Sequence, residues 1–216
     1  MRSVGQARLA VLASGEGTNL QALLDDPVVG SWVALAVSDR QHATALERAR
    51  ARGVEAVFVD PRAHADRSAF DRALLDLLLA RAIDVVVLAG YMRIVGPELV
   101  RAFEGRMLNV HPALLPAFPG TTSVADALDW GAKVTGVTVH LVDGEVDHGP
   151  IVDQEAVRVL PEDDRESLAA RVHEIEHRLL PAAVRALGEG RIVLDGRRVR
   201  VLERVAGGAV GSEARA

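Results

Sequence analysis

The 216-residue chain contains no cysteine, which excludes disulfide bonds, zinc–thiolate centres and a thiol nucleophile. It also has no apolar run of membrane-spanning length, and Met1 to Arg8 lack the apolar core of a secretion signal. Positive charge is not in excess, because the formal net charge is −5 at pH 7. A protein that binds nucleic acid through a broad basic surface is therefore disfavoured. We expect a cytoplasmic protein whose partners are small molecules, with neither nucleic acid nor a membrane among them.

The composition that remains is that of one globular domain. Hydrophobic residues make up 49% and charged residues 25% of the chain, a balance typical of soluble proteins with a single core. We find no repeat, no long linker and no second core. The sequence predicts one domain over residues 1–205 and a small, polar, disordered tail over residues 206–216. Nothing marks an interface, which leaves open whether the chain is a monomer or a homodimer.

Strand and helix patterns alternate through the first half of the chain. Short apolar runs are separated by amphipathic stretches with helical spacing. The predicted strands are residues 7–13, 33–38, 54–59, 85–89 and 107–110, and the predicted helices begin near Leu20, Ala43, Ser68 and Pro97. The most uniformly apolar run, Val85 to Ala89, is typical of a strand buried on both faces of a parallel sheet. This order predicts an α/β fold with a single doubly wound, mostly parallel, Rossmann-like sheet.

The second half of the chain has a different strand pattern. Val134 to Val142 alternates between apolar and polar or small residues with a period of two. Ile151 to Val159 follows after a turn-rich segment and is a second strand candidate. Two strands joined in this way predict an antiparallel strand pair in the C-terminal half.

A long helix is expected to follow this pair. Asp163 and Glu166 fit a capping box at its start, in which side chains satisfy free backbone N–H groups. Pro181 lies within the helical stretch, and because proline lacks the backbone N–H, we expect a break or a new helix start there. The last regular element is predicted to be a small hairpin over residues 191–201 that turns at Asp195-Gly196.

The glycine-rich segment Ser14 to Asn19 (SGEGTN) connects the first predicted strand to the first helix. In a parallel sheet this loop lies at the carboxyl edge, where ligands bind. Glycines let a ligand approach the backbone closely, and the helix start offers unpaired N–H groups to a phosphate. The spacing fits neither a dinucleotide fingerprint nor a Gly-Lys-Ser/Thr phosphate loop. A tight turn with Thr18 or Asn19 as the helix cap is therefore the structural alternative.

Asn109 and His111 lie two residues apart at the end of the fifth predicted strand. Residues at this spacing point to the same face, so the amide and the imidazole project together. Two hydrogen-bond donors aimed at one point are what a developing oxyanion requires. The alternative is a histidine at the sheet edge that caps a loop.

A carboxylate close to His111 would raise the pKa of the imidazole and keep it charged near neutral pH. The turn-rich segment between the two late strands offers Asp147 for this role. One pKa unit, about 1.4 kcal/mol, would lift an ordinary histidine pKa of about 6.5 to about 7.5. Asp143 and Glu145 are equally acidic neighbours, so the residues alone leave the choice among the three carboxylates open.

His173 and His177 are four residues apart in the segment HEIEH, which matches the H-x-x-E-H pattern of inverted zinc peptidases. Both would lie on one helical face, a workable geometry for a metal. The motif is short, however, and a zinc site there would leave His111 and Asp147 without a role. A zinc hydrolase is therefore only a remote alternative, and we expect no metal.

Three long segments closely resemble the phosphoribosylglycinamide formyltransferase family of purine biosynthesis. They are VLASGEGTNLQALL near the start, LAGYMRIVGPELVRAFEGRMLNVHPALLPAFPG over residues 88–120, and TGVTVHLVDGEVDHGPIVDQEAV in the second half. The resemblance runs from about Leu9 to Val201, with the motifs in the expected order. It implies the formyltransferase fold, and transfer of a formyl group from the co-substrate 10-formyltetrahydrofolate to the amine of phosphoribosylglycinamide, without a metal.

The resemblance also implies a role for each motif. Asn109 and His111 would stabilise the tetrahedral oxyanion, and Asp147 would keep the histidine protonated. Residues implied in binding the phosphoribosylglycinamide are Gly17, Thr18, Asn19, His173 and Glu176, the last of which would hold the ribose hydroxyls. Residues implied in binding the folate are Arg67, Met92, Arg93, Ile94, Val95 and Asn109. The HEIEH helix thereby receives an explanation that needs no metal.

Two positions depart from the family pattern or stand out within it. Some members carry histidines in a loop near the site, where this chain has TTSV over residues 121–124, so an auxiliary histidine is not carried over. Glu16 places a carboxylate beside the expected phosphate, and we expect its side chain to point to solvent.

Relatives with the same chemistry supply the alternatives. Formyltetrahydrofolate deformylase hydrolyses the same donor but is a longer protein with an N-terminal regulatory domain that this sequence lacks. Methionyl-tRNA formyltransferase adds a C-terminal RNA-binding domain, which is also lacking. The glycine-rich loop favours the small phosphorylated acceptor over both. A catalytically silent ligand-binding module would keep that loop but would have no need of His111.

Overall fold

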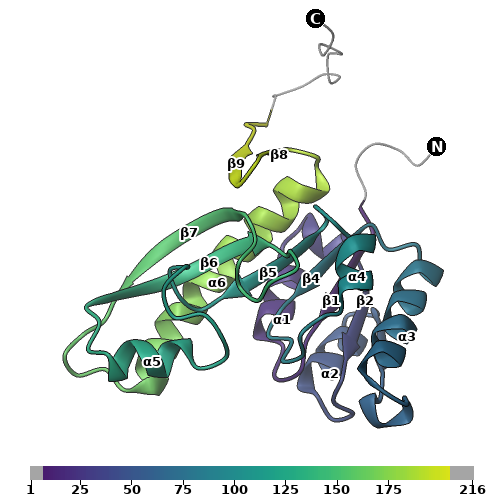
Figure 1. The fold of residues 1–216 in the computed structure, drawn as a ribbon, viewed down its shortest axis with the longest axis horizontal. Helices are drawn as coiled ribbons and strands as arrows, with labels where there is room; N and C mark the ends of the chain where they lie inside the picture. The colour runs from purple at the N-terminus through teal and green to yellow at the C-terminus, as the bar shows by residue number, and fades with distance from the viewer. Residues whose placement is uncertain (1–6, 205–216) are drawn as a thin grey trace, which may run out of the picture.

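The computed structural model describes residues 7–204, and a seven-stranded sheet forms its centre (Figure 1). The strands are β1 (Leu9–Leu12), β2 (Val33–Ser38), β3 (Glu55–Phe58), β4 (Val85–Leu88), β5 (Met107–His111), β6 (Val134–Leu141) and β7 (Ile151–Arg158). Their order is β3-β2-β1-β4-β5-β6-β7. β1 to β5 are parallel, whereas β6 and β7 are each antiparallel to the strand before. The predicted doubly wound sheet with its antiparallel pair is confirmed; the tail predicted over residues 206–216 lies outside the described residues.

Helices cover both faces of the parallel part of the sheet (Figure 1). The elements that pack on one face are α1 (Thr18–Asp25), η1 (Val29–Trp32), α2 (Thr44–Ala51) and α6 (Arg165–Gly188). On the other face lie α3 (Arg67–Ala80) and α4 (Pro97–Ala102). Shorter elements are η2 (Pro61–Ala63), α5 (Ser123–Asp129) and the separate hairpin of β8 (Ile192–Asp195) and β9 (Arg198–Val201). The predicted hairpin is thus confirmed, with its turn one residue later than predicted, at Gly196-Arg197.

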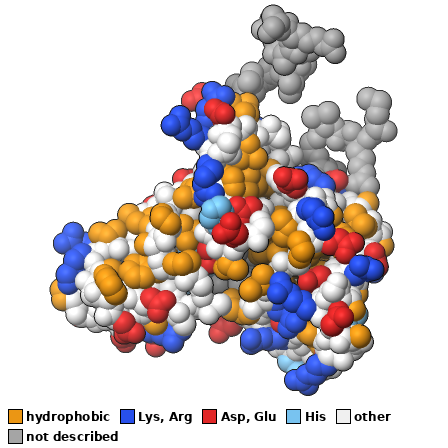
Figure 2. Space-filling model, in the orientation of Figure 1, with side chains coloured by type: hydrophobic (Ala, Val, Ile, Leu, Met, Phe, Trp, Pro, Cys, Tyr) orange, Lys and Arg blue, Asp and Glu red, His pale blue; other side chains and the backbone are white. Residues whose placement is uncertain are grey.

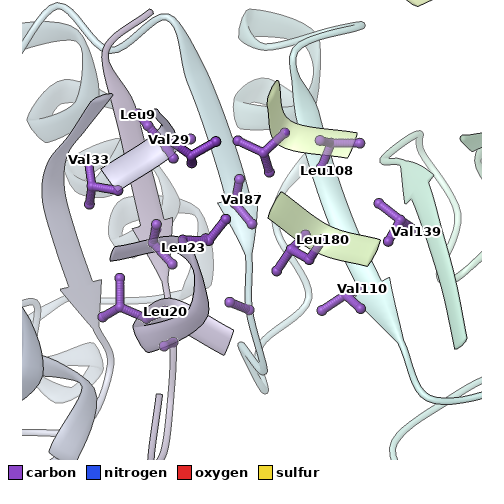
Figure 3. Close-up of a cluster of buried hydrophobic side chains, with 14 of the residues drawn as sticks. Leu9, Leu20, Leu23, Val29, Val33, Val87, Leu108, Val110, Val139 and Leu180 are labelled. Carbon is purple, nitrogen blue, oxygen red and sulfur yellow. The ribbon is translucent and has the colours of Figure 1, made fainter. Parts of the chain in front are cut away.

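The two faces of the sheet carry separate hydrophobic clusters. Successive residues of a strand point to opposite faces, so Leu9 and Val11 enter one cluster and Ala10 and Leu12 the other. Figure 3 shows the first cluster, where Leu180 of α6 lies among side chains of the sheet. Because both faces are covered, the parallel strands are continuously apolar instead of alternating.

The capping box of α6 lies one residue later than predicted and uses other partners. Asp164 is the N-cap: its carboxylate accepts from the backbone N–H of Ser167 at 2.8 Å, and its own N–H donates to Oγ of Ser167 at 3.0 Å. Asp163 pairs with Arg171 instead. The prediction with Asp163 and Glu166 was wrong because a serine at the third helical position performs the function expected of glutamate.

Pro181 does not interrupt α6, contrary to the prediction. The helix runs through it from Arg165 to Gly188. Pro181 and its neighbours Leu180 and Val184 are buried, and the latter two belong to the core between α6 and the sheet. Packing on both sides of the proline outweighs the loss of one backbone hydrogen bond.

Two features of the structure bear on the expectation that the partners include neither nucleic acid nor a membrane. On the face drawn in Figure 2, basic side chains lie interspersed with acidic ones. Within residues 7–204, no helix combines the length and the apolar character needed to cross a membrane. The cytoplasmic location stays a prediction.

The position of a ligand site follows from the topology. The chain continues from β1 toward β2 on one side and from β4 toward β5 on the other. Neighbouring parallel strands whose connections diverge in this way leave a crevice at their carboxyl ends, which is where open α/β sheets bind ligands.

Candidate active site

A cavity of about 450 Å³ opens at this switch point. Four segments form most of its wall: residues 15–19 after β1, 88–95 at the end of β4, 109–112 at the end of β5 and 142–147 after β6. The side chains of His173 and Glu176, both from α6, complete the lining. The segments that carried the motifs in the sequence therefore meet in one place.

The cavity brings together all but one of the predicted site residues. Its lining includes Gly17, Thr18, Asn19, Met92, Arg93, Ile94, Val95, Asn109, His111, Asp147, His173 and Glu176. Arg67 lies outside the lining, and its guanidinium donates to the carbonyl oxygen of Ile94 at 2.8 Å. Arg67 thus supports the wall formed by residues 88–95 from behind.

Gly17 gives the glycine-rich loop its shape. It is the N-cap of α1 with a φ of 72°, in the left-handed region that favours glycine. A Cβ at this position would lie 2.6 Å from the Cβ of Ala45. No side chain caps α1, so the alternative in which Thr18 or Asn19 caps the helix is wrong. The first-turn N–H groups, which have no partner within a helix, therefore lie at the cavity wall.

The loop is held to α2 through its backbone. The N–H of Ala45 donates to the carbonyl oxygen of Gly15 at 3.1 Å, and Nε of Arg48 donates to that of Glu16 at 2.8 Å. Glu16 is exposed, as expected from the sequence. Its carboxylate is therefore solvated, and water and salt screen its repulsion of an anion bound at the helix start.

Asn19 and Glu176 form a buried polar pair on the same side of the cavity. Nδ2 of Asn19 donates to Oε2 of Glu176 at 2.8 Å, and Glu176 is 4% exposed. Burial raises the pKa of Glu176, although the bond from Asn19 and the charge of His173 act against this rise. The Oδ1 atom of Asn19 is buried without a hydrogen-bond partner. A buried oxygen without a partner is uncommon, because burial removes it from water without replacing the lost hydrogen bond.

His111 is buried at the centre of the cavity wall. Its Nε2 lies 2.9 Å from the carbonyl oxygen of Phe118 and 3.1 Å from Oγ of Ser123. Because Ser123 donates its own proton to Gly120, Nε2 carries a proton and donates to both oxygens. Nδ1 lies 3.4 Å from Oδ2 of Asp147, which is an electrostatic contact longer than a strong hydrogen bond. The choice among the three acidic residues of the sequence is thereby decided for Asp147.

The electrostatics of this pair differ from the expectation. Burial lowers the pKa of His111; the bond to Phe118 and the charge of Asp147 only partly oppose this effect. The predicted rise was wrong for the free protein, because the desolvation of the imidazolium outweighs the attraction of one carboxylate. Burial would raise the pKa of Asp147, but the neighbouring His140, the hydrogen bond from the N–H of Gly120 and the nearby His111 together lower it. Asp147 is therefore ionised at neutral pH.

His140 is a site residue that the sequence reasoning missed. It lies on β6 directly opposite Asn109 of β5. Its Nδ1 donates to the carbonyl oxygen of Leu141 at 2.9 Å, so its Nε2 accepts from Nδ2 of Asn109 at 3.1 Å. The same Nδ2 lies 3.3 Å from Oδ1 of Asp147. These two acceptors fix the direction in which the amide N–H groups of Asn109 point.

Two residues that contact His111 have unusual backbone conformations. Phe118 and Asp147 are non-glycine residues with φ values of 50° and 52°. Such conformations cost energy and persist only where surrounding contacts enforce them, often at functional sites. Ser123 belongs to the segment of residues 121–124, whose role the sequence left open, and Phe118 lies just before that segment.

Comparison with known proteins assigns the family. A family model described as formyl transferase matches residues 7–184. The phosphoribosylglycinamide formyltransferase of Mycobacterium tuberculosis is 49% identical over 193 residues, which cover 88% of this chain and 89% of that protein. The chain belongs to the phosphoribosylglycinamide formyltransferases. The crystal structure of glycinamide ribonucleotide transformylase 1 from Symbiobacterium toebii superposes with a TM-score of 0.89 at 50% identity, covering 92% of this chain and 95% of that one.

A hydrolase of the same fold is also similar to this formyltransferase. The crystal structure of a formyltetrahydrofolate deformylase from Pseudomonas syringae has a TM-score of 0.84 at 28% identity. The match covers 92% of this chain and 66% of that one. Because a deformylase has the same fold, the fold alone does not identify the acceptor of the formyl group.

In the structure of this formyltransferase, the residues of the zinc-like motif contact groups other than a metal ligand set. The rings of His173 and His177 stack with their centroids 6.2 Å apart, and the glutamate of the motif, Glu176, is bonded to Asn19. Among residues 7–204, no group of three or more His, Asp or Glu side chains is arranged to hold a metal ion. The helix thus supplies polar groups to the cavity and has no third metal ligand beside the two histidines.

Proposed function

We propose that the chain transfers the formyl group of 10-formyltetrahydrofolate to the amine of phosphoribosylglycinamide. The observation that carries this proposal is the position of Asn109, His111 and Asp147. They lie in one cavity between a helix start suited to a phosphate and an apolar wall suited to a flat ring. Family membership supports the same reaction.

The acceptor would bind on the side of α1 and α6. Its phosphate fits the N-terminus of α1 at residues 17–19, where unpaired N–H groups and the helix dipole favour negative charge. Its ribose hydroxyls would pair with Glu176, whose carboxylate is held by Nδ2 of Asn19. These contacts would place the amine of the glycinamide arm toward His111 and Asn109.

The folate would bind against residues 91–95 and the loop after β6. Met92, Ile94 and Val146 are 53%, 59% and 54% exposed, and all three line the cavity. Exposed apolar side chains gathered at one cleft are typical of a ligand site. The backbone N–H and C=O groups of the segment would supply the hydrogen bonds that orient a pteridine ring.

The chemistry then follows from the contacts. The neutral amine attacks the formyl carbon, a C–N bond forms, and the carbonyl electron pair moves to the oxygen. The protonated Nδ1 of His111 would donate to this oxyanion, and so would the Asn109 N–H that lies 3.3 Å from Asp147 in the free protein, once it turns toward the substrate. The negative charge raises the pKa of His111 in the transition state, which offsets the lowering by burial in the free protein. Collapse restores the carbonyl and breaks the bond to N10, and the proton lost by the acceptor amine passes to N10, through a water ordered by Asp147.

One experiment separates this reaction from that of the deformylase. Purified protein is mixed with 10-formyl folate, with and without phosphoribosylglycinamide, and folate turnover is followed spectrophotometrically. Turnover that requires the ribonucleotide supports the transferase. Turnover without it would assign the hydrolase, and full activity in His111→Ala would refute the proposed role of that side chain.

A further inference from the structure

Ser14 is a buried side chain for which the proposed chemistry has no role. It lies two residues after the end of β1, is 1% exposed and does not line the cavity. Its Oγ donates to Oδ1 of Asp39 at 2.6 Å and accepts from the backbone N–H of Met92 at 2.9 Å. Asp39 follows β2, and Met92 belongs to the wall after β4. One hydroxyl therefore links the ends of three neighbouring strands.

The two hydrogen bonds of Ser14 strengthen each other. A hydroxyl that donates to a carboxylate makes a short, charge-assisted bond, and 2.6 Å is within the usual range for one. Donation to Asp39 polarises the oxygen, which becomes a better acceptor for the Met92 N–H. In a buried setting, loss of the hydroxyl would leave that N–H without its partner.

We propose that Ser14, together with Asp39, is a positioning residue for the folate subsite. It acts by fixing the backbone of Met92, and with it the wall of residues 91–95. The inference rests on the proposed function, because that wall is where the folate would bind. Arg67 fixes the same wall at Ile94, so Ser14 and Arg67 hold it at two points.

The glycine-rich loop does not depend on the Ser14 hydroxyl. The backbone N–H of Ser14 donates to the carbonyl oxygen of Gly90 at 3.1 Å. Gly15 and Glu16 are held through their carbonyl oxygens by Ala45 and Arg48. Removing the hydroxyl should therefore disturb the folate wall and leave the acceptor subsite in place.

The test is Ser14→Ala, measured as a split between the kinetic constants of the two substrates. We expect KM for the folate to rise about 10-fold, equivalent to about 1.4 kcal/mol. KM for the ribonucleotide and kcat should stay within about 2-fold, since neither the loop backbone nor His111 is touched. Titration with tetrahydrofolate should show the same rise in Kd without any turnover.

Ser38→Ala is the matched control. Ser38 is also a buried serine at the end of a strand, 0% exposed, and its Oγ accepts from the N–H of Arg40 at 3.1 Å without contacting the folate wall. Its removal should lower the melting temperature as Ser14→Ala does but leave the folate KM unchanged. An equal rise in folate KM in both variants would mean that general destabilisation is the cause, and would overturn the proposal.

A double-mutant cycle with Asp39→Ala completes the test. Asp39→Ala alone should raise the folate KM less than Ser14→Ala, and the double variant should be no worse than Ser14→Ala, because both act through one hydroxyl. Additive effects, or wild-type folate affinity in Ser14→Ala, would overturn the proposal. If the wild-type protein neither turns over nor binds folate, the proposed function itself fails, which is a distinguishable result.

Discussion

The Nδ1 atom of His111 lies 3.4 Å from Oδ2 of Asp147, and the two side chains are only 4% and 8% exposed. The ionised carboxylate of Asp147 stabilises the protonated form of the neighbouring imidazole. This effect adds to that of negative charge developing on the substrate. The left-handed conformation of Asp147 and its bond from the N–H of Gly120 hold the carboxylate at this distance. The pair thus links a local backbone conformation to the chemistry that we propose for formyl transfer.

Asp147→Asn should lower kcat by about 100- to 1,000-fold, because the shape remains while the charge that supports the imidazolium is lost. Steady-state kinetics with both substrates saturating measures this loss. Glu145→Gln removes the same charge from the same loop, where the side chain is exposed, and should have a much smaller effect. Equal losses in the two variants would show that the loop acts through its total charge and not through the contact with His111.

His140→Leu should lower kcat about 10-fold and leave both KM values nearly unchanged, since the amide of Asn109 loses the acceptor that orients it. The variant is compared with Asn109→Ala and with the double variant. If the two residues act through one amide, the double variant is no slower than Asn109→Ala. Multiplicative losses would contradict this dependence and give His140 a role of its own.

The affinity for the ribonucleotide should weaken in acid at a pH above the ordinary glutamate pKa of about 4.3. The reason is that burial raises the pKa of Glu176, so the carboxylate takes up a proton earlier than an exposed one and loses an acceptor for the ribose. KM for the ribonucleotide, measured as a function of pH, should rise as the pH falls through the raised pKa. In Glu176→Gln the KM should be higher and this acid limb absent; an unchanged limb would assign it to another group.

Gly17→Ala should destabilise the fold by about 1–3 kcal/mol, because alanine is strained in the left-handed region and its Cβ would overlap that of Ala45. Chemical denaturation measures the change. Gly15→Ala is the control within the same loop: a Cβ there meets nothing within 4 Å, and its φ is not positive. A similar loss of stability in both variants would contradict the explanation.

The fold was predictable from the sequence wherever a local pattern of apolar residues reflects how a strand is buried. The continuously apolar run at Val85–Leu88 indicated a strand covered on both faces, and it is the central strand β4. The alternating run at 134–142 indicated the change to antiparallel pairing, which the structure shows for β6 and β7. The prediction failed at the start of α6, where Ser167 replaces the expected glutamate in the capping box. It also failed at Pro181, where buried packing against the sheet outweighs the local preference of one residue.

The site was predictable only in part, for a related reason. Motifs such as SGEGTN and NVHP could be placed at strand ends from the sequence, and parallel topology then brings those ends to one edge. The choice of Asp147 over Asp143 and Glu145, and the roles of His140 and Ser14, depend on contacts between residues far apart in the chain. No local pattern carries such information.

The sequence alone determined the family, the layered α/β architecture and the segments that line the cavity, because each depends on local periodicity or on short motifs. The tertiary structure alone decided the pairing of Asn109 with His140, which follows from the register of β5 and β6. It also decided the direction of the pKa shift at His111, since burial is a property of the packed molecule and opposes the nearby carboxylate. Register and desolvation are set by contacts across the whole domain, and the sequence of one segment does not contain them.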